Sequence, residues 1–309
     1  MILPSWLRVA RPAFLASALV LALVAPPALA SRSAATPLHA VGAENFYADV
    51  IRQIGGRHVV VTSVLSDPNT DPHAYESSTV DASAVARADF VVANGVGYDD
   101  FMAKLENASP NPSRTVIDVG AMFGKKPGDN PHLWFDPATM PRVAARIATE
   151  LTRRDPADAR EFRANLKAFT TSLAPWTTQI ARLRKRYAKT PVAVTEPVFN
   201  DTLDAVGLDV RTPVSFQLAI EEGNDPAPQD VHTVSALITN KSVAVLVYNE
   251  QTVEPSTKRL LALARDAKVP VVGVYETMPR GQTYQSWMRA EIEALEAALA
   301  HGRSTEMIR

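Results

Sequence analysis

Residues 38–65 read LHAVGAENFYADVIRQIGGRHVVVTSVL, and this stretch decides the fold class. Two apolar runs, Leu38–Ala43 and His58–Leu65, enclose an amphipathic segment of helix length, Asn45–Ile54, which two glycines end. A strand, a helix and a second strand in this order are typical of a βα unit on a parallel sheet. The stretch therefore predicts an α/β protein.

The same alternation of strand-like and helix-like segments continues through two halves of the chain. Runs rich in Val and Ile alternate with amphipathic segments long enough to form helices. Further strands are expected at Phe90–Ala93, Thr115–Val119, Val192–Thr195, Asp209–Arg211, Val243–Tyr248 and Val271–Tyr275, and further helices at Thr79–Arg87, Asp99–Asn107, Pro137–Arg154, Val198–Ala205, Pro228–Thr239, Ser256–Ala267 and Tyr284–Leu299. The pattern predicts two α/β lobes, each built on a mainly parallel sheet.

Between the halves lies Pro156–Lys189, which is too long and too charged to be a loop. Its apolar residues recur at helical spacing, and Pro175 is expected to bend the helix near Ser172. We interpret the segment as a helical spine that joins the lobes; an ordinary helix within one domain fits the spacing equally well. The expected division is a signal peptide at 1–30, a first lobe at 31–155, a linker helix at 156–189 and a second lobe at 190–309.

The composition is that of an ordinary globular protein. The 309 residues include 46% hydrophobic and 21% charged residues, and 32 Lys and Arg against 33 Asp and Glu give a formal net charge of −1. This balance argues against disorder and leaves no electrostatic footprint for nucleic acid. The chain has no cysteine, which excludes disulfides, Fe–S clusters, thiolate zinc sites and cysteine nucleophiles.

The N-terminus predicts export. Arg8 and Arg11 precede an apolar run, Ala13–Val24, and small residues at Ala28 and Ala30 mark a cleavage site of the secretory type. The alternative is a membrane anchor, but a spanning helix needs about 20 apolar residues. With no cysteine at the cleavage point, we expect an exported, periplasmic chain that is not lipidated.

Four side chains form the candidate metal site. His73 and His132 each follow a Pro in a loop after a predicted strand, and Glu196 and Glu276 each follow an apolar strand of the second half. Ligands of α/β sheets bind beyond the carboxyl ends of the strands. Two imidazoles and two carboxylates suit a first-row divalent ion such as Mn²⁺ or Zn²⁺. The remaining histidines are expected to be structural or exposed: His39, His58, His232 and His301.

Three stretches then resemble a known family, the solute-binding proteins of high-affinity zinc and manganese ABC transporters. They are Asp71-Pro72-His73-Ala74-Tyr75-Glu76, Asn94-Gly95-Val96-Gly97-Tyr98-Asp99, and Asn130-Pro131-His132-Leu133-Trp134-Phe135-Asp136-Pro137. The resemblance implies two Rossmann-like (βα)4 lobes, joined by a single long linker helix, with the metal in the interlobe cleft. It implies ligands His73 and His132 from the first lobe and Glu196 and Glu276 from the second. It further implies a monomer without an organic cofactor, which delivers Mn²⁺ or Zn²⁺ to a membrane permease and its ATPase.

The chain departs from the family's zinc-type members at the third ligand. Those members usually have His where this chain has Glu196, and many carry a long His-rich loop where Phe123–Asn130 is short. Manganese-type members resemble this chain in having Glu there, but they usually have Asp at the fourth position. Glu222 and Glu250 therefore compete with Glu276 for that place, and the choice of metal leans towards manganese.

Two other functions compete with metal transport. One is a secreted zinc metallohydrolase on the same two lobes, and the other is a protein that binds haem or an iron chelate. A catalytic zinc site usually keeps three protein ligands and an open position for water. The chain has no HExxH pair and no Gly-x-Ser-x-Gly elbow, and small hard ligands do not suit a large chelate. We therefore expect a binding protein and not an enzyme.

Overall fold

The computed structural model describes residues 36–67, 70, 75–252 and 254–307. Residues from Thr36 onward form one compact unit. The predicted signal peptide and His73 lie outside the described residues, so the structure gives no account of either. Within the described ranges, no helix is both long enough and apolar enough to cross a membrane.

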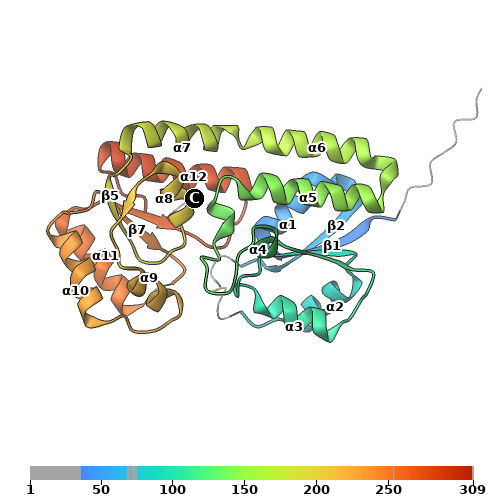
Figure 1. Cartoon of the computed structure of the whole chain (residues 1–309), viewed down its shortest axis with the longest axis horizontal. Helices are drawn as coiled ribbons and strands as arrows, with labels where there is room; N and C mark the ends of the chain where they lie inside the picture. The colour runs from blue at the N-terminus through green and yellow to red at the C-terminus, as the bar shows by residue number, and fades with distance from the viewer. Residues whose placement is uncertain (1–35, 68–69, 71–74, 253, 308–309) are drawn as a thin grey trace, which may run out of the picture. The chain divides into compact units, whose positions relative to one another are not determined.

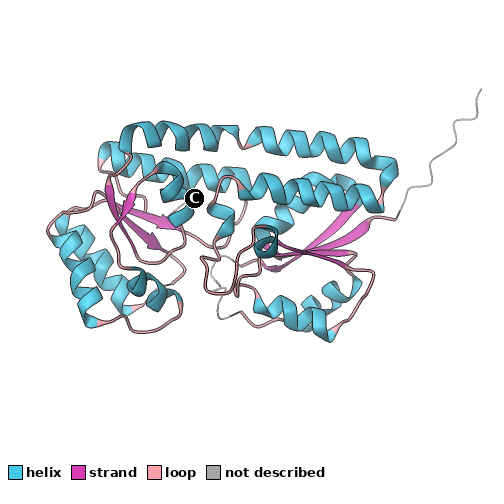
Figure 2. Ribbon diagram, in the orientation of Figure 1, coloured by secondary structure: helices cyan, strands magenta, loops and turns pink. Residues whose placement is uncertain are grey.

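Two four-stranded parallel sheets form the framework of this unit (Figure 2). The first has the order β2-β1-β3-β4, and the second has the order β6-β5-β7-β8. The strands are β1 (Leu38–Glu44), β2 (Val59–Leu65), β3 (Phe90–Ala93), β4 (Thr115–Asp118), β5 (Pro191–Val194), β6 (Asp209–Val210), β7 (Leu246–Asn249) and β8 (Val271–Val274). Each half thus has the predicted α/β class, and β1 and β5 occupy matching places in the two sheets.

Helices cover these sheets at nearly all of the predicted places (Figure 1). They are α1 (Asn45–Gly55), α2 (Thr79–Arg87), α3 (Asp100–Ala108), α4 (Val119–Met122), α5 (Thr139–Arg154), α8 (Asn200–Val206), α9 (Val214–Glu221), α10 (Pro228–Thr239), α11 (Pro255–Ala267) and α12 (Tyr284–His301). The short helices α4 and α9 were not predicted. β7 begins at Leu246, three residues later than expected. Val243 and Val245, which precede it, are buried in the core but lie outside the strand.

The segment between the halves forms two helices where a single long helix was predicted. A 3₁₀ turn at Pro156–Asp158 leads into α6 (Ala159–Ser172), and α7 (Ala174–Tyr187) follows after Leu173. The break has the physical cause that the sequence indicates: Pro175 has no amide hydrogen to donate to the carbonyl four residues earlier. Figure 1 shows α6 and α7 following one another along the same side of the unit.

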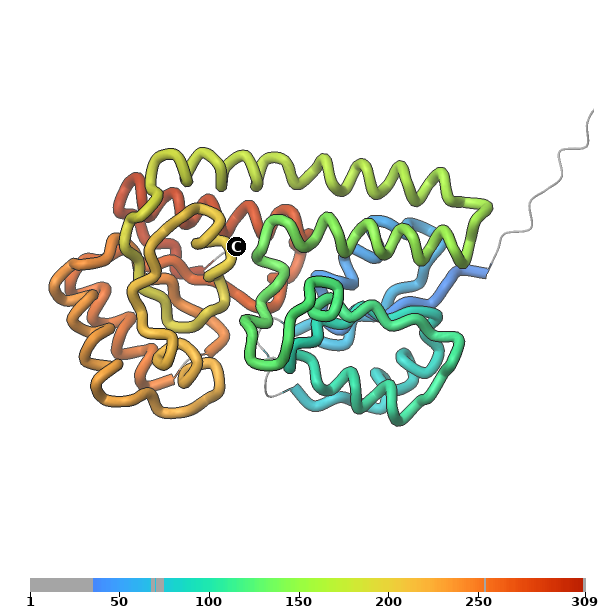
Figure 3. Tube along the Cα trace, in the orientation of Figure 1, coloured from blue at the N-terminus to red at the C-terminus, as the bar shows by residue number. Residues whose placement is uncertain are grey.

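One hydrophobic cluster runs through both halves. Phe46 of the first half contacts Trp134 and Trp287, with ring centroids 4.5 and 5.8 Å away, and Phe135 lies 5.4 Å from Trp287. Figure 3 shows why these residues meet: α12, at the end of the chain, returns beside α7, and it also contacts α1. The site described next therefore lies between two sheets that share a core.

Candidate metal site

His132 is held in one orientation before any ligand arrives. It precedes the 3₁₀ turn Leu133–Phe135 and is completely buried. Its Nδ1–H donates to Oδ1 of Asn130 over 2.8 Å, which directs Nε2 the other way, to within 3.2 Å of Oε2 of Glu276. Burial alone would lower the pKa of His132, but the carboxylates of Glu221 and Glu276 raise it above its ordinary value. The imidazole therefore holds a proton against Glu276, in a place where a cation could replace it.

Glu276 comes from the other half of the chain. It lies two residues after β8 ends, at the carboxyl edge of that sheet, and it is completely buried. The side chain of Gln251 accepts a hydrogen bond of 2.9 Å from the backbone N–H of Thr277, which fixes this turn. Oε1 of Glu276 accepts a hydrogen bond of 2.7 Å from Nδ2 of Asn249, at the end of β7. His132 and Glu276 thus join the two halves across the site.

Glu196 lies beside Glu276 in the second half. It follows β5 and is only 3% exposed, and its Oε2 accepts a hydrogen bond of 2.9 Å from the same Nδ2 of Asn249. Its Oε1 is buried without a hydrogen bond to any other described residue. Burial and the neighbouring charge of Glu276 raise the pKa of Glu196 well above its usual range. Two buried carboxylates that share one amide donor concentrate negative charge, which a divalent cation would offset.

The structure therefore brings together three of the four predicted ligands. His132 contacts Glu276, and Glu276 shares the Asn249 amide with Glu196, so one nitrogen and two carboxylates lie in succession. The two glutamates follow the carboxyl ends of β8 and β5, where α/β proteins bind ligands. This donor set fits Mn²⁺ or Zn²⁺. The fourth predicted ligand, His73, is not among the described residues.

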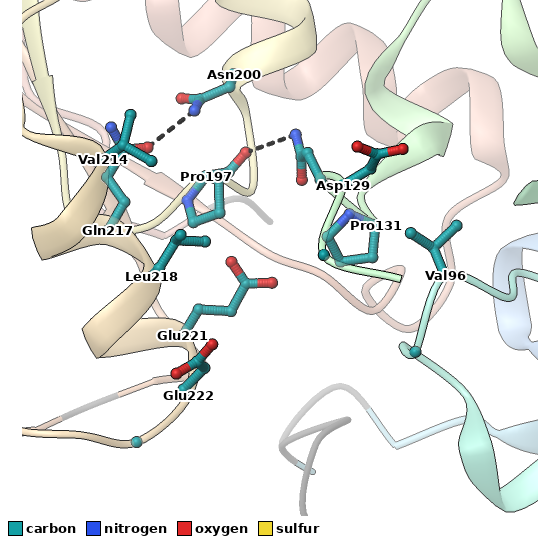
Figure 4. A pocket seen from close by; sticks show the side chains of 14 residues that line it. Val96, Asp129, Pro131, Pro197, Asn200, Val214, Gln217, Leu218, Glu221 and Glu222 are labelled. Atoms are coloured by element: carbon teal, nitrogen blue, oxygen red, sulfur yellow. Dashed lines mark hydrogen bonds between the residues drawn. The ribbon is translucent and has the colours of Figure 1, made fainter. Parts of the chain in front are cut away.

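A cavity of about 720 Å³ opens beside these residues (Figure 4). On one side it is lined by Asn130, which holds His132, and on the other by Pro197, which follows Glu196. Nδ2 of Asn130 donates to the Pro197 carbonyl over 3.2 Å, so this contact ties the two halves at the cavity wall. In Figure 4 the carboxylate of Glu221, on α9, points into the open space. Exposed apolar side chains of α9, Val214 and Leu218, complete that wall.

The comparison with known families decides which family this chain belongs to. The model of the family described as zinc-uptake complex component A, periplasmic, matches residues 41–298. The chain belongs to this family.

Curated relatives of this zinc-uptake component family match nearly the whole chain. The manganese-binding lipoprotein MntA of Bacillus subtilis is 25% identical over 293 residues, covering 87% of this chain and 92% of the relative. The manganese ABC transporter substrate-binding lipoprotein PsaA of Streptococcus pneumoniae is 22% identical over 287 residues, covering 85% and 89%. Both are named lipoproteins, whereas this chain contains no cysteine. The expectation that this chain carries no lipid therefore sets it apart from these two lipoproteins.

Solved structures of similar fold support the two-lobe architecture. The periplasmic zinc-binding protein TroA of Treponema pallidum superimposes with a TM-score of 0.71 at 19% identity, covering 86% of this chain and all of TroA. The Mn-bound periplasmic metal-binding protein of Candidatus Liberibacter asiaticus gives a TM-score of 0.66 at 17% identity, covering 84% and 98%. The expected fold class is confirmed, and neither the hydrolase nor the chelate-binding alternative finds support among the relatives of the zinc-uptake component family.

The two competing carboxylates lie in less favourable places. Glu222 is exposed at the rim of the cavity, where its side chain accepts a hydrogen bond from Asn224. Glu250 lines a different cavity, of about 590 Å³, together with Arg265. Burial and the charge of Glu306 raise the pKa of Glu250 to about 7. Of the three candidates for the fourth position, Glu276 alone contacts a predicted histidine ligand in the described part of the chain.

Among the other histidines, His58 has partners that the sequence did not indicate. Its ring nitrogens lie 3.2 Å from Asp158 and 3.1 Å from Glu161, and Asp155 is also close. The cluster joins the start of β2 to the start of α6. His39, His232 and His301 are exposed, as expected.

Sequence reasoning missed two polar residues at the site, and it also missed a buried carboxyl group at the end of β1. Asn249 donates to both carboxylates, Asn130 orients His132, and Glu44 is completely buried at the end of β1. Glu44 and Asn249 share the signal that identified Glu196 and Glu276, a polar residue at the carboxyl end of an apolar strand.

Proposed function

We propose that this protein is the substrate-binding component of an ABC transporter, which captures Mn²⁺ or Zn²⁺ in the periplasm. It would deliver the ion to a membrane permease that is driven by an ATPase. The observation that carries the proposal is the buried contact of His132 with Glu276, which shares the Asn249 amide with the buried Glu196. Membership of the zinc-uptake component family and the manganese-binding relatives support it.

The ligand set we propose is His73 and His132 from a first lobe at 31–155, and Glu196 and Glu276 from a second lobe at 190–309. Segment 156–189 joins these lobes. His73 would approach from the loop after β2, whose carboxyl end belongs to the same sheet edge as the other first-half residues of the site. Four protein ligands from two lobes enclose an ion without leaving a position for substrate water, which favours carriage over catalysis. We therefore propose that the protein is not an enzyme.

Two further properties belong to the proposal. The chain acts as a monomer without nucleic acid, and it is exported without a lipid because it has no cysteine to carry one. The cavity beside Asn130 and Pro197 would serve as the path of the ion, because its walls are formed by the neighbours of His132 and Glu196.

Manganese is the ion that the ligands favour. Mn²⁺ prefers oxygen donors and a coordination number above four, whereas Zn²⁺ favours nitrogen or sulfur donors in a tetrahedron. Two carboxylates, each able to offer two oxygens, give the site more oxygen than nitrogen. The raw affinities of such a site still run in favour of zinc, so both ions are to be tested.

The test is the loss of one ligand compared with the loss of an exposed histidine. Replacing His132 by Ala should weaken binding of Mn²⁺ and Zn²⁺ at least about tenfold, because a direct ligand is removed. The matched control is His232→Ala, an exposed histidine on α10, which should leave both dissociation constants unchanged. Isothermal titration of the metal-free proteins measures both. Normal binding by the His132 variant would contradict the proposed site.

A further inference from the structure

Glu44 is a completely buried carboxylic acid whose two oxygens form no hydrogen bond with any other described residue. It occupies the N-cap position of α1, yet its side chain makes no capping hydrogen bond. Buried polar groups nearly always have partners, and a buried carboxylate without one is strongly unfavourable. The fold thus maintains an unfavourable group at this position, and neither capping nor pairing accounts for it.

The position of Glu44 corresponds to that of Glu196. β1 and β5 hold the second place in matching strand orders, and each is flanked by the next two strands of its half. Side chains alternate along a strand, so Glu44 points to the same face as Ala40, and Glu196 continues the face of Val192 and Val194. All three apolar residues belong to the core that both halves share. The two glutamates are therefore counterparts, each at the end of a strand face that packs into this core.

The neighbours of Glu44 connect it with the candidate metal site. Tyr98 follows β3, next to β1, and its ring lies 5.9 Å from that of His132. Burial, and then the charges of Glu276 and Glu44, raise the pKa of Tyr98 well above its usual range. On the other side of β1, the end of β2 pairs with Glu44 at Leu65. Glu44 thus lies at the carboxyl end of an inner strand of its sheet.

We propose that Glu44 is a further ligand of the bound metal ion, its carboxylate binding the cation together with His132, Glu196 and Glu276. The inference rests on the proposed function, because it assigns the unpaired carboxylate to the ion that the site would carry. A third carboxylate raises the share of oxygen donors and the coordination number, and both changes favour Mn²⁺ over Zn²⁺. The cation is then the partner that the metal-free protein lacks.

The competing explanation is that Glu44 is an uncharged core residue that stabilises the fold. The two explanations predict opposite effects on the metal-free protein. If Glu44 is a ligand that destabilises the fold without its ion, replacing it by Gln or Leu should leave the melting temperature unchanged or raise it. If Glu44 instead stabilises the core, the same replacements should lower the melting temperature.

The experiment compares Glu44→Gln and Glu44→Leu with Glu150→Gln. Glu150 is also buried, but it pairs with Arg153 and Arg154 at a distance from the site, so its variant controls for the loss of a buried carboxylate. We expect both Glu44 variants to weaken Mn²⁺ binding at least tenfold and Zn²⁺ binding less, without a fall in the metal-free melting temperature. The control should lower that temperature and leave both dissociation constants unchanged.

A direct count of donors completes the test. X-ray absorption at the Mn edge should show one oxygen donor fewer in Glu44→Leu than in the parent protein. Dissociation constants within twofold of the parent in both variants would overturn the inference, and so would a fall in the metal-free melting temperature of Glu44→Gln. A failure of this inference can be told from a failure of the proposed function. A parent protein that binds no metal contradicts the proposed function. If the Glu44 variants bind metal normally while His132→Ala loses binding, only this inference is contradicted.

Discussion

Asn249 positions both carboxylates of the site, because its one amide nitrogen donates hydrogen bonds to Glu196 and to Glu276. The amide sets the two carboxyl groups side by side without neutralising either. Burial and the charge of Glu276 favour the protonated form of Glu196 in the metal-free protein, and a cation would displace that proton. The chemistry of binding is therefore an exchange of protons for metal.

The first consequence is a dependence of stability on pH. In the folded metal-free protein, burial raises the pKa of Glu196 above its ordinary value and that of Asp99 to about 7. The pKa of His132 is also raised, because the nearby carboxylates of Glu221 and Glu276 outweigh the effect of burial. Groups with raised values bind more protons in the folded state than in the unfolded state, so their stabilisation is lost as pH rises through the folded values. We predict that the metal-free melting temperature falls between about pH 5 and pH 8.

Saturating Mn²⁺ should reverse this trend, because the ion replaces the protons and binds more tightly as they leave. Melting curves recorded with and without Mn²⁺ at several pH values measure both effects. A gain in melting temperature from Mn²⁺ that is larger at pH 5 than at pH 8 would contradict proton exchange at the site.

The second consequence concerns selectivity through Glu196. Replacing this residue by His would add a nitrogen donor where the chain now supplies a carboxylate with one unpaired oxygen. We predict that Glu196→His loses Mn²⁺ affinity while keeping or gaining Zn²⁺ affinity, because zinc favours nitrogen donors and four-coordination. The ratio of the two dissociation constants is the quantity to measure, since general damage would weaken both ions together. An unchanged ratio would show that Glu196 does not set selectivity.

Among the secondary-structure elements, those with strong local signals are the ones that the sequence predicts correctly. The predicted helix Thr79–Arg87 has its observed bounds, and a capping box at Ser78 and Asp81 fixes its start. The helix α9 was missed because its outward face carries Val214 and Leu218, which obscure the amphipathic pattern. Its start directly after Pro213 is set by packing around the cavity, which no local pattern contains.

The same division applies to the elements that form the site. The strand ends that carry Glu196 and Glu276 could be predicted, because a carboxylate after an apolar strand is visible in the sequence. The roles of Asn249 and Glu44 depend on which strands are neighbours in each sheet, and strand order is a tertiary property. The break between α6 and α7 was half predicted: Pro175 marks its place, but the sequence does not tell a bent helix from two separate ones.

For the described unit as a whole, the shared core explains how two sheets can hold one site. The ring centroids of Trp134 and Phe46 lie 4.5 Å apart. The backbone carbonyl of Trp134 accepts a hydrogen bond from the hydroxyl of Tyr284, on α12. Nδ2 of Asn45 donates to the carbonyl of Met278 over 2.7 Å, two residues beyond Glu276. These contacts fix His132 relative to Glu196 and Glu276, the proposed ligands of the second half, so the geometry of the site depends on both halves together.

The central claim is that this site holds one divalent metal ion. Native mass spectrometry of the exported chain, purified without added metal and then incubated with Mn²⁺ or Zn²⁺, tests it most directly, with the double variant Glu196→Gln, Glu276→Gln alongside. The account predicts a mass increase of one ion per chain in the parent protein and none in the double variant, whose carboxylate charges are gone while their shape remains. A parent protein that binds no ion, or a double variant that still binds one, would contradict it.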